Sequence, residues 1–154
     1  HHNINITYTY TVNKMKFKDF LTEKTQELRW AIGDHANKAI RNYSHRDDFM
    51  IVWLRPDDVI KNSDPQMRVS PDDKANHIGT RMQRAIDHFK EDGWMDPPIV
   101  AYDRYTTTEF KVTVDDGRHR IAALKKMGVK RFPAYIMKDD LDLLKKVINI
   151  KLEK

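Results

Sequence analysis

The chain contains no cysteine. A disulfide framework and a thiolate metal site are therefore excluded, and this composition predicts a cytoplasmic protein. The sequence also lacks any apolar run that approaches the roughly 20 residues of a membrane-spanning helix, so we expect no membrane partner. His77 and His88 are too scattered to form a metal-ligand pair, and no metal site is predicted.

The length and composition are those of one domain. The chain has 154 residues, of which 40% are hydrophobic and 33% charged, and no internal repeat is visible. His1 and His2 resemble the remnant of a purification tag, so we assign residues 1–14 to a tag, to vector sequence or to an N-terminal extension. Residues 15–154 then form the single domain. The net charge of +5, from 28 basic and 23 acidic residues, mildly favours anionic partners.

One stretch in the second half of the chain combines a strand, a turn and a helix. Its first part alternates between apolar and polar residues, which predicts a half-buried strand with one face formed by Phe110, Val112 and Val114. Asp115 and Asp116 are expected to end this strand. Either aspartate can then cap the helix that follows.

The helix of this stretch has an unusually basic beginning. Gly117 allows a sharp turn or a close approach to a ligand, and Gly128 is placed to end the helix. Arg118, His119 and Arg120 fall in the first helical turn, where the positive end of the helix dipole disfavours cations. A bound phosphate would explain them, because a helix N-terminus favours anions. The alternative is a surface turn in which Asp115 and Asp116 neutralise the two arginines.

Apolar periodicity predicts the remaining elements. Helices are expected over residues 17–43, from Ser70 to Gly93, and from Asp139 or Asp140 to about Leu152. Strands are expected over residues 49–54, 99–102, 109–114 and 132–136, with 99–114 as a hairpin and Pro133 at a strand start or a sheet edge. Residues 55–69 are expected to be irregular. The predicted fold is α+β: a small mixed sheet, surrounding helices and a helical arm at each end.

Several ordered segments resemble the ParB/sulfiredoxin superfamily. Its central box is similar to Asp116-Gly117-Arg118-His119-Arg120 with the helix that follows and the later Phe132-Pro133-Ala134-Tyr135-Ile136. Upstream, the resemblance includes an apolar strand that ends in Leu54-Arg55-Pro56, and Arg68 after a short loop. It also includes a helix from Ile78 to Gly93 and a strand with the sequence Pro97-Pro98-Ile99-Val100. The resemblance covers about residues 50–137, which we take as the core of the domain.

The resemblance implies a site for a nucleoside di- or triphosphate such as ATP, ADP or CTP. If the residues that match the family's box have the family's roles, Gly117 would allow the phosphates to approach the backbone closely. Arg118, His119 and Arg120 would contact phosphate oxygens. Arg68 would lie near the same phosphates. Sulfiredoxins have a cysteine nucleophile at the position of Arg118, so this chain cannot reduce sulfinic acids by their route.

Three functions remain open. The first is a ParB-like nucleotide-binding protein that acts on or with DNA, including nuclease or NTPase activity, as an accessory protein of phage or plasmid type. The second is a small-molecule phosphotransferase similar to free serine kinases, with Asp116 as general base, His119 offsetting phosphoryl charge and Mg²⁺ bridging the phosphates. The third is a non-catalytic regulatory or inhibitor module. The terminal helices are expected to serve a homodimer or a protein partner.

Overall fold

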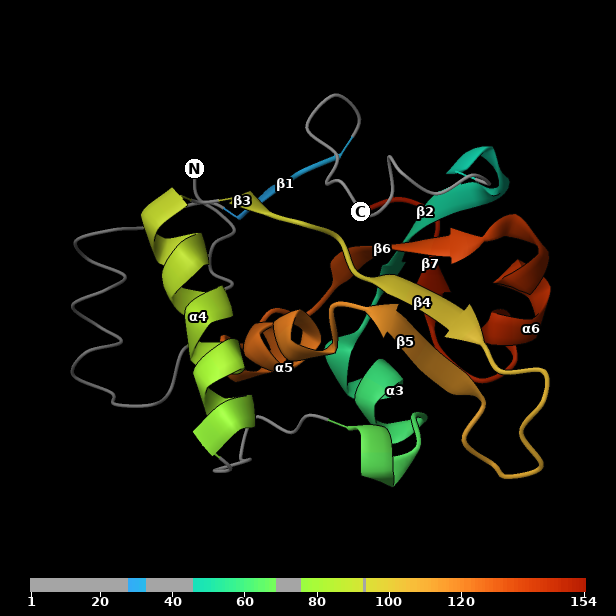
Figure 1. The fold of residues 1–154 in the computed structure, drawn as a ribbon. Coiled ribbons are helices and arrows are strands. Elements are labelled where there is room, and N and C mark those ends of the chain that lie inside the picture. The colour runs from blue at the N-terminus through green and yellow to red at the C-terminus, as the bar shows by residue number, and fades with distance from the viewer. Residues whose placement is uncertain (1–27, 33–45, 69–75, 93) are drawn as a thin grey trace.

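The computed structural model describes residues 28–32, 46–68, 76–92 and 94–154. Within residues 76–92, side chains are described only from residue 81 on. These residues form an α+β fold with two sheets (Figure 1). The larger sheet has the order β5-β4-β6-β2-β7, with β2 (Phe49–Leu54), β4 (Ile99–Tyr102), β5 (Val112–Asp116), β6 (Phe132–Met137) and β7 (Ile150–Lys151). The smaller sheet pairs β1 (Arg29–Trp30) with β3 (Trp94–Met95).

The described helices are α3 (Pro56–Lys61), α4 (Asn76–Asp92), α5 (Arg118–Lys126) and α6 (Leu141–Lys145), with 3₁₀ turns η3 (Arg46–Asp48), η4 (Pro65–Met67) and η5 (Lys138–Asp140). No helix among the described residues has the length and apolar character needed to cross a membrane.

The larger sheet is mixed, as the sequence predicts. β2 runs antiparallel to β6 over six residue pairs, from Phe49↔Met137 to Leu54↔Phe132, and β4 and β5 form the predicted antiparallel hairpin. β4 meets β6 in parallel at Ile99↔Tyr135. β6 therefore lies inside the sheet, so of the two positions expected for Pro133, a strand start or a sheet edge, the strand start is confirmed and the sheet edge is wrong. The proline is tolerated near the start of the strand, two residues before the contact with β4 begins.

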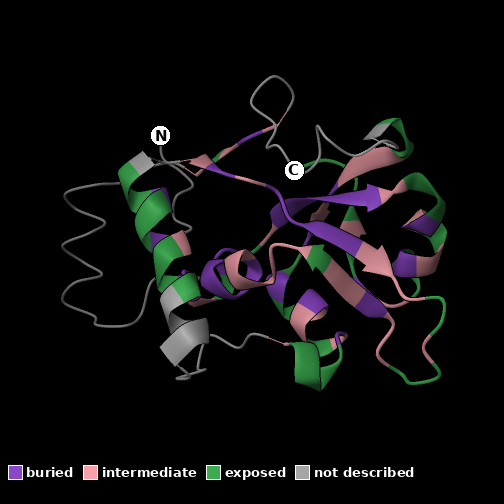
Figure 2. Ribbon diagram, in the orientation of Figure 1, coloured by how far each residue is buried: buried purple, intermediate pink, exposed green. Residues whose placement is uncertain are grey.

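The main core lies between one face of this sheet and helices α3, α4 and α5. α5 packs against both other helices, and its residues Ile121, Ala122, Ala123 and Leu124 are all buried (Figure 2). Four successive buried residues mean that neighbours surround this helix on most sides. Fully burying each large apolar side chain contributes about 1.5–3 kcal/mol. The middle of α5 is consequently anchored in the core, in contact with α3 and α4.

The two predicted helical arms have different outcomes: the C-terminal helix is present in shortened form as α6, which begins after Asp140, whereas the helix predicted over residues 17–43 lies mostly outside the described residues. Arg29 and Trp30, which fall inside the predicted helix of residues 17–43, form strand β1, because their backbone pairs with Trp94 and Met95. The rest of that range lies mostly outside the described residues. At the other end α6 stops at Lys145, and the chain turns back to pair β7 with the open edge of β2. Edge pairing satisfies backbone groups that a longer helix would leave exposed on β2.

Local element boundaries also differ from the expectation. The segment of residues 55–68, expected to be irregular, contains α3 and η4. The sequence signal for α3 was Pro56 at the first helical position with acidic residues behind it. The strand expected over residues 109–114 lies two to three residues later, as β5. The predicted helix start at Ser70 lies outside the described residues, whereas α4 ends at Asp92, beside the expected Gly93.

Candidate functional site

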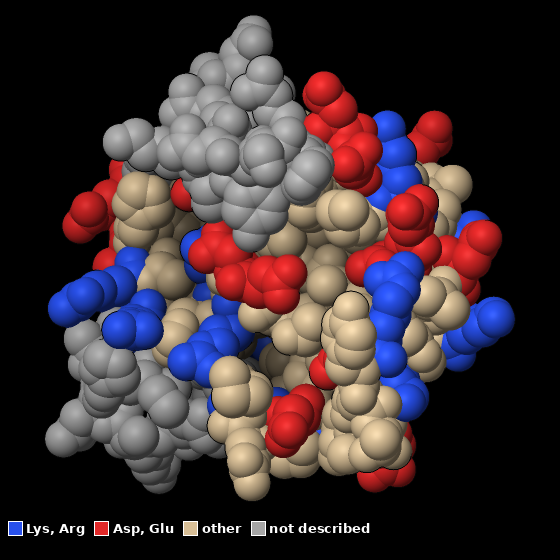
Figure 3. Space-filling model, turned by 45° about the vertical axis from the view of Figure 1, so that its right-hand side comes forward, with Lys and Arg blue, Asp and Glu red and all other residues tan. Residues whose placement is uncertain are grey.

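A cavity of about 500 Å³ opens beside the junction of β5 and α5, within the size range of small-molecule sites. Its basic side chains come from separate segments: the guanidinium groups of Arg68, Arg81 and Arg118, and the imidazole of His119. Its carboxylates are Asp64, Asp103, Asp115 and Asp116, and its main apolar side chains are Val59, Ile60, Met67, Phe110, Val112 and Ile121. In the space-filling view, basic and acidic side chains gather on different sides of a central hollow (Figure 3).

A bulge in the β4–β5 ladder shapes one side of the cavity. Ile99 pairs with Asp116 while Val100 pairs with Val114, so Asp115 is an extra residue on β5. In a regular strand, alternate side chains point to opposite faces. Here Val114, Asp115 and Asp116 all line the cavity. The bulge therefore brings two neighbouring carboxylates to one site.

Gly117 makes the turn from β5 into α5. It is the N-cap of the helix in the left-handed region, with φ of 97°, so the prediction that Asp115 or Asp116 caps α5 is wrong. A Cβ at this position would lie 2.9 Å from the Cβ of Pro98 and 2.8 Å from a guanidinium nitrogen of Arg120. Both the backbone conformation and the space thus require glycine here.

Arg120 is directed toward protein acceptors. Its Nε donates to the backbone oxygen of Asp96 at 3.0 Å, and its Nη2 donates to Oδ2 of Asp116 at 3.1 Å. Its side chain is 24% exposed and is not among the residues that line the cavity. The guanidinium therefore joins β5, α5 and the segment before β4. Of the predicted phosphate ligands, it is the one that the structure does not bring to the cavity.

Arg118 and His119 do line the cavity. Nη1 of Arg118 is 3.4 Å from the backbone oxygen of Met67, so this side chain spans from α5 to the loop after α3. The Nε2 atom of His119 is buried. The guanidinium of Arg118, together with the backbone N–H groups of the first turn of α5, gives the cavity a cationic end, and the imidazole of His119 lies beside it.

Arg68 approaches the cavity from the loop of residues 62–68. Its Nε donates to the backbone oxygen of Ser63 at 2.8 Å, and its Nη2 donates to that of Lys61 at 3.0 Å. Its Cζ lies 5.1 Å from the centroid of the Phe110 ring. Two in-plane hydrogen bonds and a ring contact fix the orientation of the guanidinium plane.

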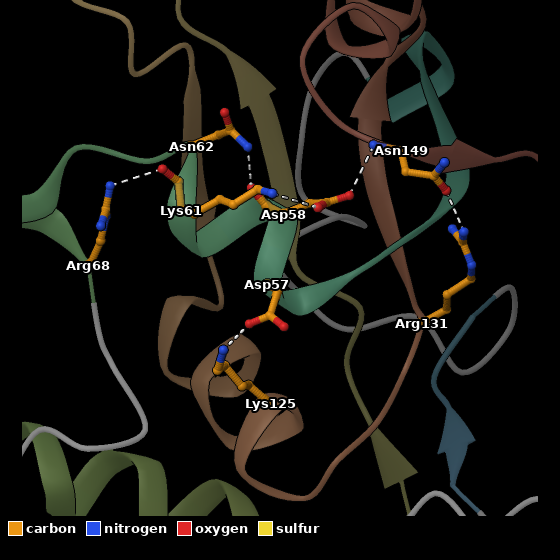
Figure 4. Close-up of polar contacts among 8 residues, drawn as sticks. All are labelled: Asp57, Asp58, Lys61, Asn62, Arg68, Lys125, Arg131 and Asn149. Atoms are coloured by element: carbon orange, nitrogen blue, oxygen red, sulfur yellow. Dashed lines mark hydrogen bonds and ion pairs between the residues drawn. The ribbon is translucent and has the colours of Figure 1, made fainter.

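The 62–68 loop is itself anchored to β5 and α3. The N–H of Val112 donates to the oxygen of Asn62 at 3.1 Å, and the hydroxyl of Ser63 donates to the oxygen of Val59 at 2.6 Å. A polar network continues from there (Figure 4). Asp57 of α3 pairs with Lys125 of α5, and the N–H of Asn149 donates to Asp58. These contacts hold α3 against α5 and against the segment before β7.

Asp115 is the extra residue of the β5 bulge, and its carboxylate is partly surrounded by protein. Its pKa is raised above the usual 3.8, first because the surrounding protein partly desolvates the carboxylate and second because the charge of Asp140 lies nearby. The side chain still reaches solvent, which screens both effects. Asp140 is itself buried, accepting hydrogen bonds from the N–H of Tyr102 at 3.0 Å and from Arg104.

No family model, curated protein or solved structure matches this chain.

The arrangement suits an elongated anionic ligand with a flat or apolar part. The described residues contain no cluster of three or more histidine or acidic side chains placed to hold a metal ion. Asp115 and Asp116 are the carboxylates nearest the start of α5, and they could share a metal that arrives with phosphates.

The cavity also includes residues that the sequence did not assign to a site. Arg81 on α4 reaches it, as do Asp103, Thr106 and Phe110 of the β4–β5 hairpin. The only sequence signal for Phe110 was its place on the inward face of the predicted strand. Nothing in the sequence indicated that α4 and this hairpin border the same space, because that proximity arises from packing around α5.

Proposed function

We propose that this chain binds a nucleoside di- or triphosphate with the phosphates at the N-terminus of α5, as a ParB/sulfiredoxin-like protein. One observation carries the proposal. The start of α5 opens onto a cavity of about 500 Å³ that Arg68, Arg81 and Arg118 reach from three separate segments. Helix N-terminal N–H groups have no intrahelical acceptors and favour anions. The guanidinium groups of Arg81 and Arg118 add charge-assisted hydrogen bonds to phosphate oxygens.

The residues of the junction then have distinct roles. Gly117 allows the phosphates to approach the backbone, and Arg118 and His119 contact phosphate oxygens. Arg120 holds the junction in place through Asp116. Mg²⁺ accompanies the nucleotide, with Asp115 and Asp116 as the carboxylates available to it.

Titration calorimetry with ATP, ADP, CTP and GTP, with and without Mg²⁺, tests the proposal. Two matched variants on α4 sharpen it, because Arg81 lines the cavity and Arg84, three residues later, does not. Arg81→Met should weaken nucleotide binding by about ten-fold, the value of one charge-assisted contact. Arg84→Met should leave binding unchanged. Absence of binding for all four nucleotides would exclude the proposed function.

We further propose that the nucleotide-bound protein acts on or with DNA. The support is the net charge of +5 and the exposed Arg81 and Arg84 of α4. Such binding is mainly electrostatic and weakens steeply with salt. Gel-shift titrations at several salt concentrations, with and without nucleotide, test this. Binding that does not respond to salt, or no binding at low salt, would contradict it.

Phosphoryl transfer to a small molecule is the second candidate, and one observation favours it. The carboxylates of Asp103, Asp115 and Asp116 line the same cavity as the cationic end. The sequence suggests Asp116 as the general base of this reaction, but Asp116 is paired with Arg120. We therefore assign the base role to Asp115, one residue earlier, whose raised pKa makes it a better proton acceptor for an attacking hydroxyl. Transfer from ATP to free serine should then fall in Asp115→Asn. No turnover in the native protein with any nucleotide and metal would favour a non-catalytic module.

A further inference from the structure

The 62–68 loop and the β4–β5 hairpin form a flat surface inside the cavity. The Arg68 guanidinium lies over the Phe110 ring, with 5.1 Å between its Cζ and the ring centroid, and both side chains line the cavity. Met67, which is 60% exposed, lines the same space. An exposed apolar side chain beside a guanidinium–aromatic pair offers planar groups a surface on which to stack.

The hydrogen bonds of Arg68 determine what this surface can do. Nε and Nη2 already donate to the backbone oxygens of Ser63 and Lys61, at 2.8 and 3.0 Å. These bonds use the Nε–Nη2 edge of the guanidinium, one of the two edges that can form a two-pronged contact with phosphate. They also hold the plane in one orientation, so a stacked ligand group would not have to immobilise a long side chain.

The cavity thus has two chemically different ends. The α5 end presents Arg118, His119 and helix N–H groups, whereas the other end presents Arg68, Phe110 and Met67. Arg118 reaches the backbone oxygen of Met67 at 3.4 Å, so the two ends lie within the length of one small ligand. A nucleotide has a matching division into a charged phosphate chain and a planar base.

We propose that Arg68 and Phe110 form a stacking platform for the nucleobase, so that Arg68 recognises the base rather than the phosphates. This inference rests on the proposed function, because it concerns the second end of the same cavity. The base supplies the planar group, and its stacking adds affinity that inorganic polyphosphate lacks. Arg68 and Phe110 are specificity-determining residues in this arrangement.

Titration calorimetry with CTP, ATP and inorganic tripolyphosphate at one Mg²⁺ concentration tests the platform. The native protein should bind at least one of the two nucleotides about ten-fold or more tightly than tripolyphosphate, as expected from one base stack. Arg68→Lys keeps the charge but removes the plane, and Phe110→Leu keeps an apolar side chain but removes the ring. Each variant should lose most of that preference while its affinity for tripolyphosphate stays unchanged.

Three results would overturn the platform while leaving the phosphate site intact. The first is that the native protein binds nucleotides and tripolyphosphate equally well. The second is that Arg68→Lys loses affinity for nucleotide and for tripolyphosphate by the same factor. The third is that Arg68→Lys and Phe110→Leu keep the native preference for nucleotide. Failure to bind either nucleotide or tripolyphosphate would instead overturn the proposed function, and the platform with it.

Two controls address the fold. Phe110→Tyr retains the ring and should retain the preference for nucleotide. Melting temperatures show whether Arg68→Lys has destabilised the loop. If it has, the nucleotide preference of Phe110→Leu decides the question, because this variant leaves both hydrogen bonds of Arg68 in place.

Discussion

The two basic sides of the cavity are built in opposite ways. At the start of α5, the backbone is fixed by Gly117 packing against Pro98 and by Arg120 pairing with Asp116. In the 62–68 loop, a single side chain, Arg68, holds the backbone by donating to two carbonyl oxygens of its own segment. The first side depends on buried helix packing, whereas the second depends on local hydrogen bonds.

This difference shows that neighbouring arginines need not share a role. Arg118 and Arg120 are two residues apart on one helix, yet only Arg118 lines the cavity. Arg120 has two protein acceptors and is largely shielded from solvent. Hydrogen bonds to a charged group contribute about 1.5–3 kcal/mol. We therefore assign Arg120 to the stability of the junction and Arg118 to ligand binding.

The largest effect is expected for Gly117→Ala, which disrupts the α5 side. A residue other than glycine held at positive φ costs about 1–3 kcal/mol. The added Cβ also lies within 2.9 Å of Pro98, so the backbone must move. Urea unfolding should show a loss of at least this size, and calorimetry should show weaker nucleotide binding.

Gly128→Ala is the matched control for that variant. Gly128 also has a positive φ, of 75°, but it lies at the opposite end of α5 from the cavity. Its substitution should reduce stability and leave nucleotide affinity unchanged. Equal loss of affinity in both glycine variants would show that the cavity responds to stability alone.

The next effect separates the two arginines of the α5 side. Arg120→Met should lower the free energy of unfolding by about 1–3 kcal/mol, because Asp116 and the oxygen of Asp96 lose their donor. Arg118→Met should change stability by less than about 0.5 kcal/mol, as is usual for surface substitutions. Its nucleotide affinity should nevertheless fall by about ten-fold. Chemical unfolding and calorimetry on both variants measure this, and a reversed pattern would contradict the assignment.

The smallest effect concerns pH and the bulged Asp115. Its folded pKa is raised above 3.8, so the folded protein holds this proton more tightly than the unfolded chain. The resulting contribution to stability is fully present below 3.8 and is lost as pH rises through the raised folded pKa. Asp115→Asn should therefore gain melting temperature relative to the native protein as pH rises through this window. Parallel curves for the two proteins would contradict the shift.

Local sequence signals predicted the elements that local physics decides. Strand β2, the β4–β5 hairpin, α5 with its terminal Gly128, and β6 follow from apolar periodicity and from glycine positions. The predictions failed where a distant partner decided the outcome. Arg29 and Trp30 are strand because Trp94 and Met95 pair with them, and residues 150–151 are strand because β2 has an open edge.

The sequence by itself determined that a strand, a glycine turn and a basic helix start follow one another at residues 112–126. It could not determine which basic side chain faces a ligand, since spacing along a helix does not show what lies opposite. Only the tertiary structure decided that Arg120 turns to Asp96 and Asp116 while Arg68 and Arg81 arrive from distant segments. The physical reason is that a cavity is formed by packing between elements, and its lining depends on contacts that no single segment encodes.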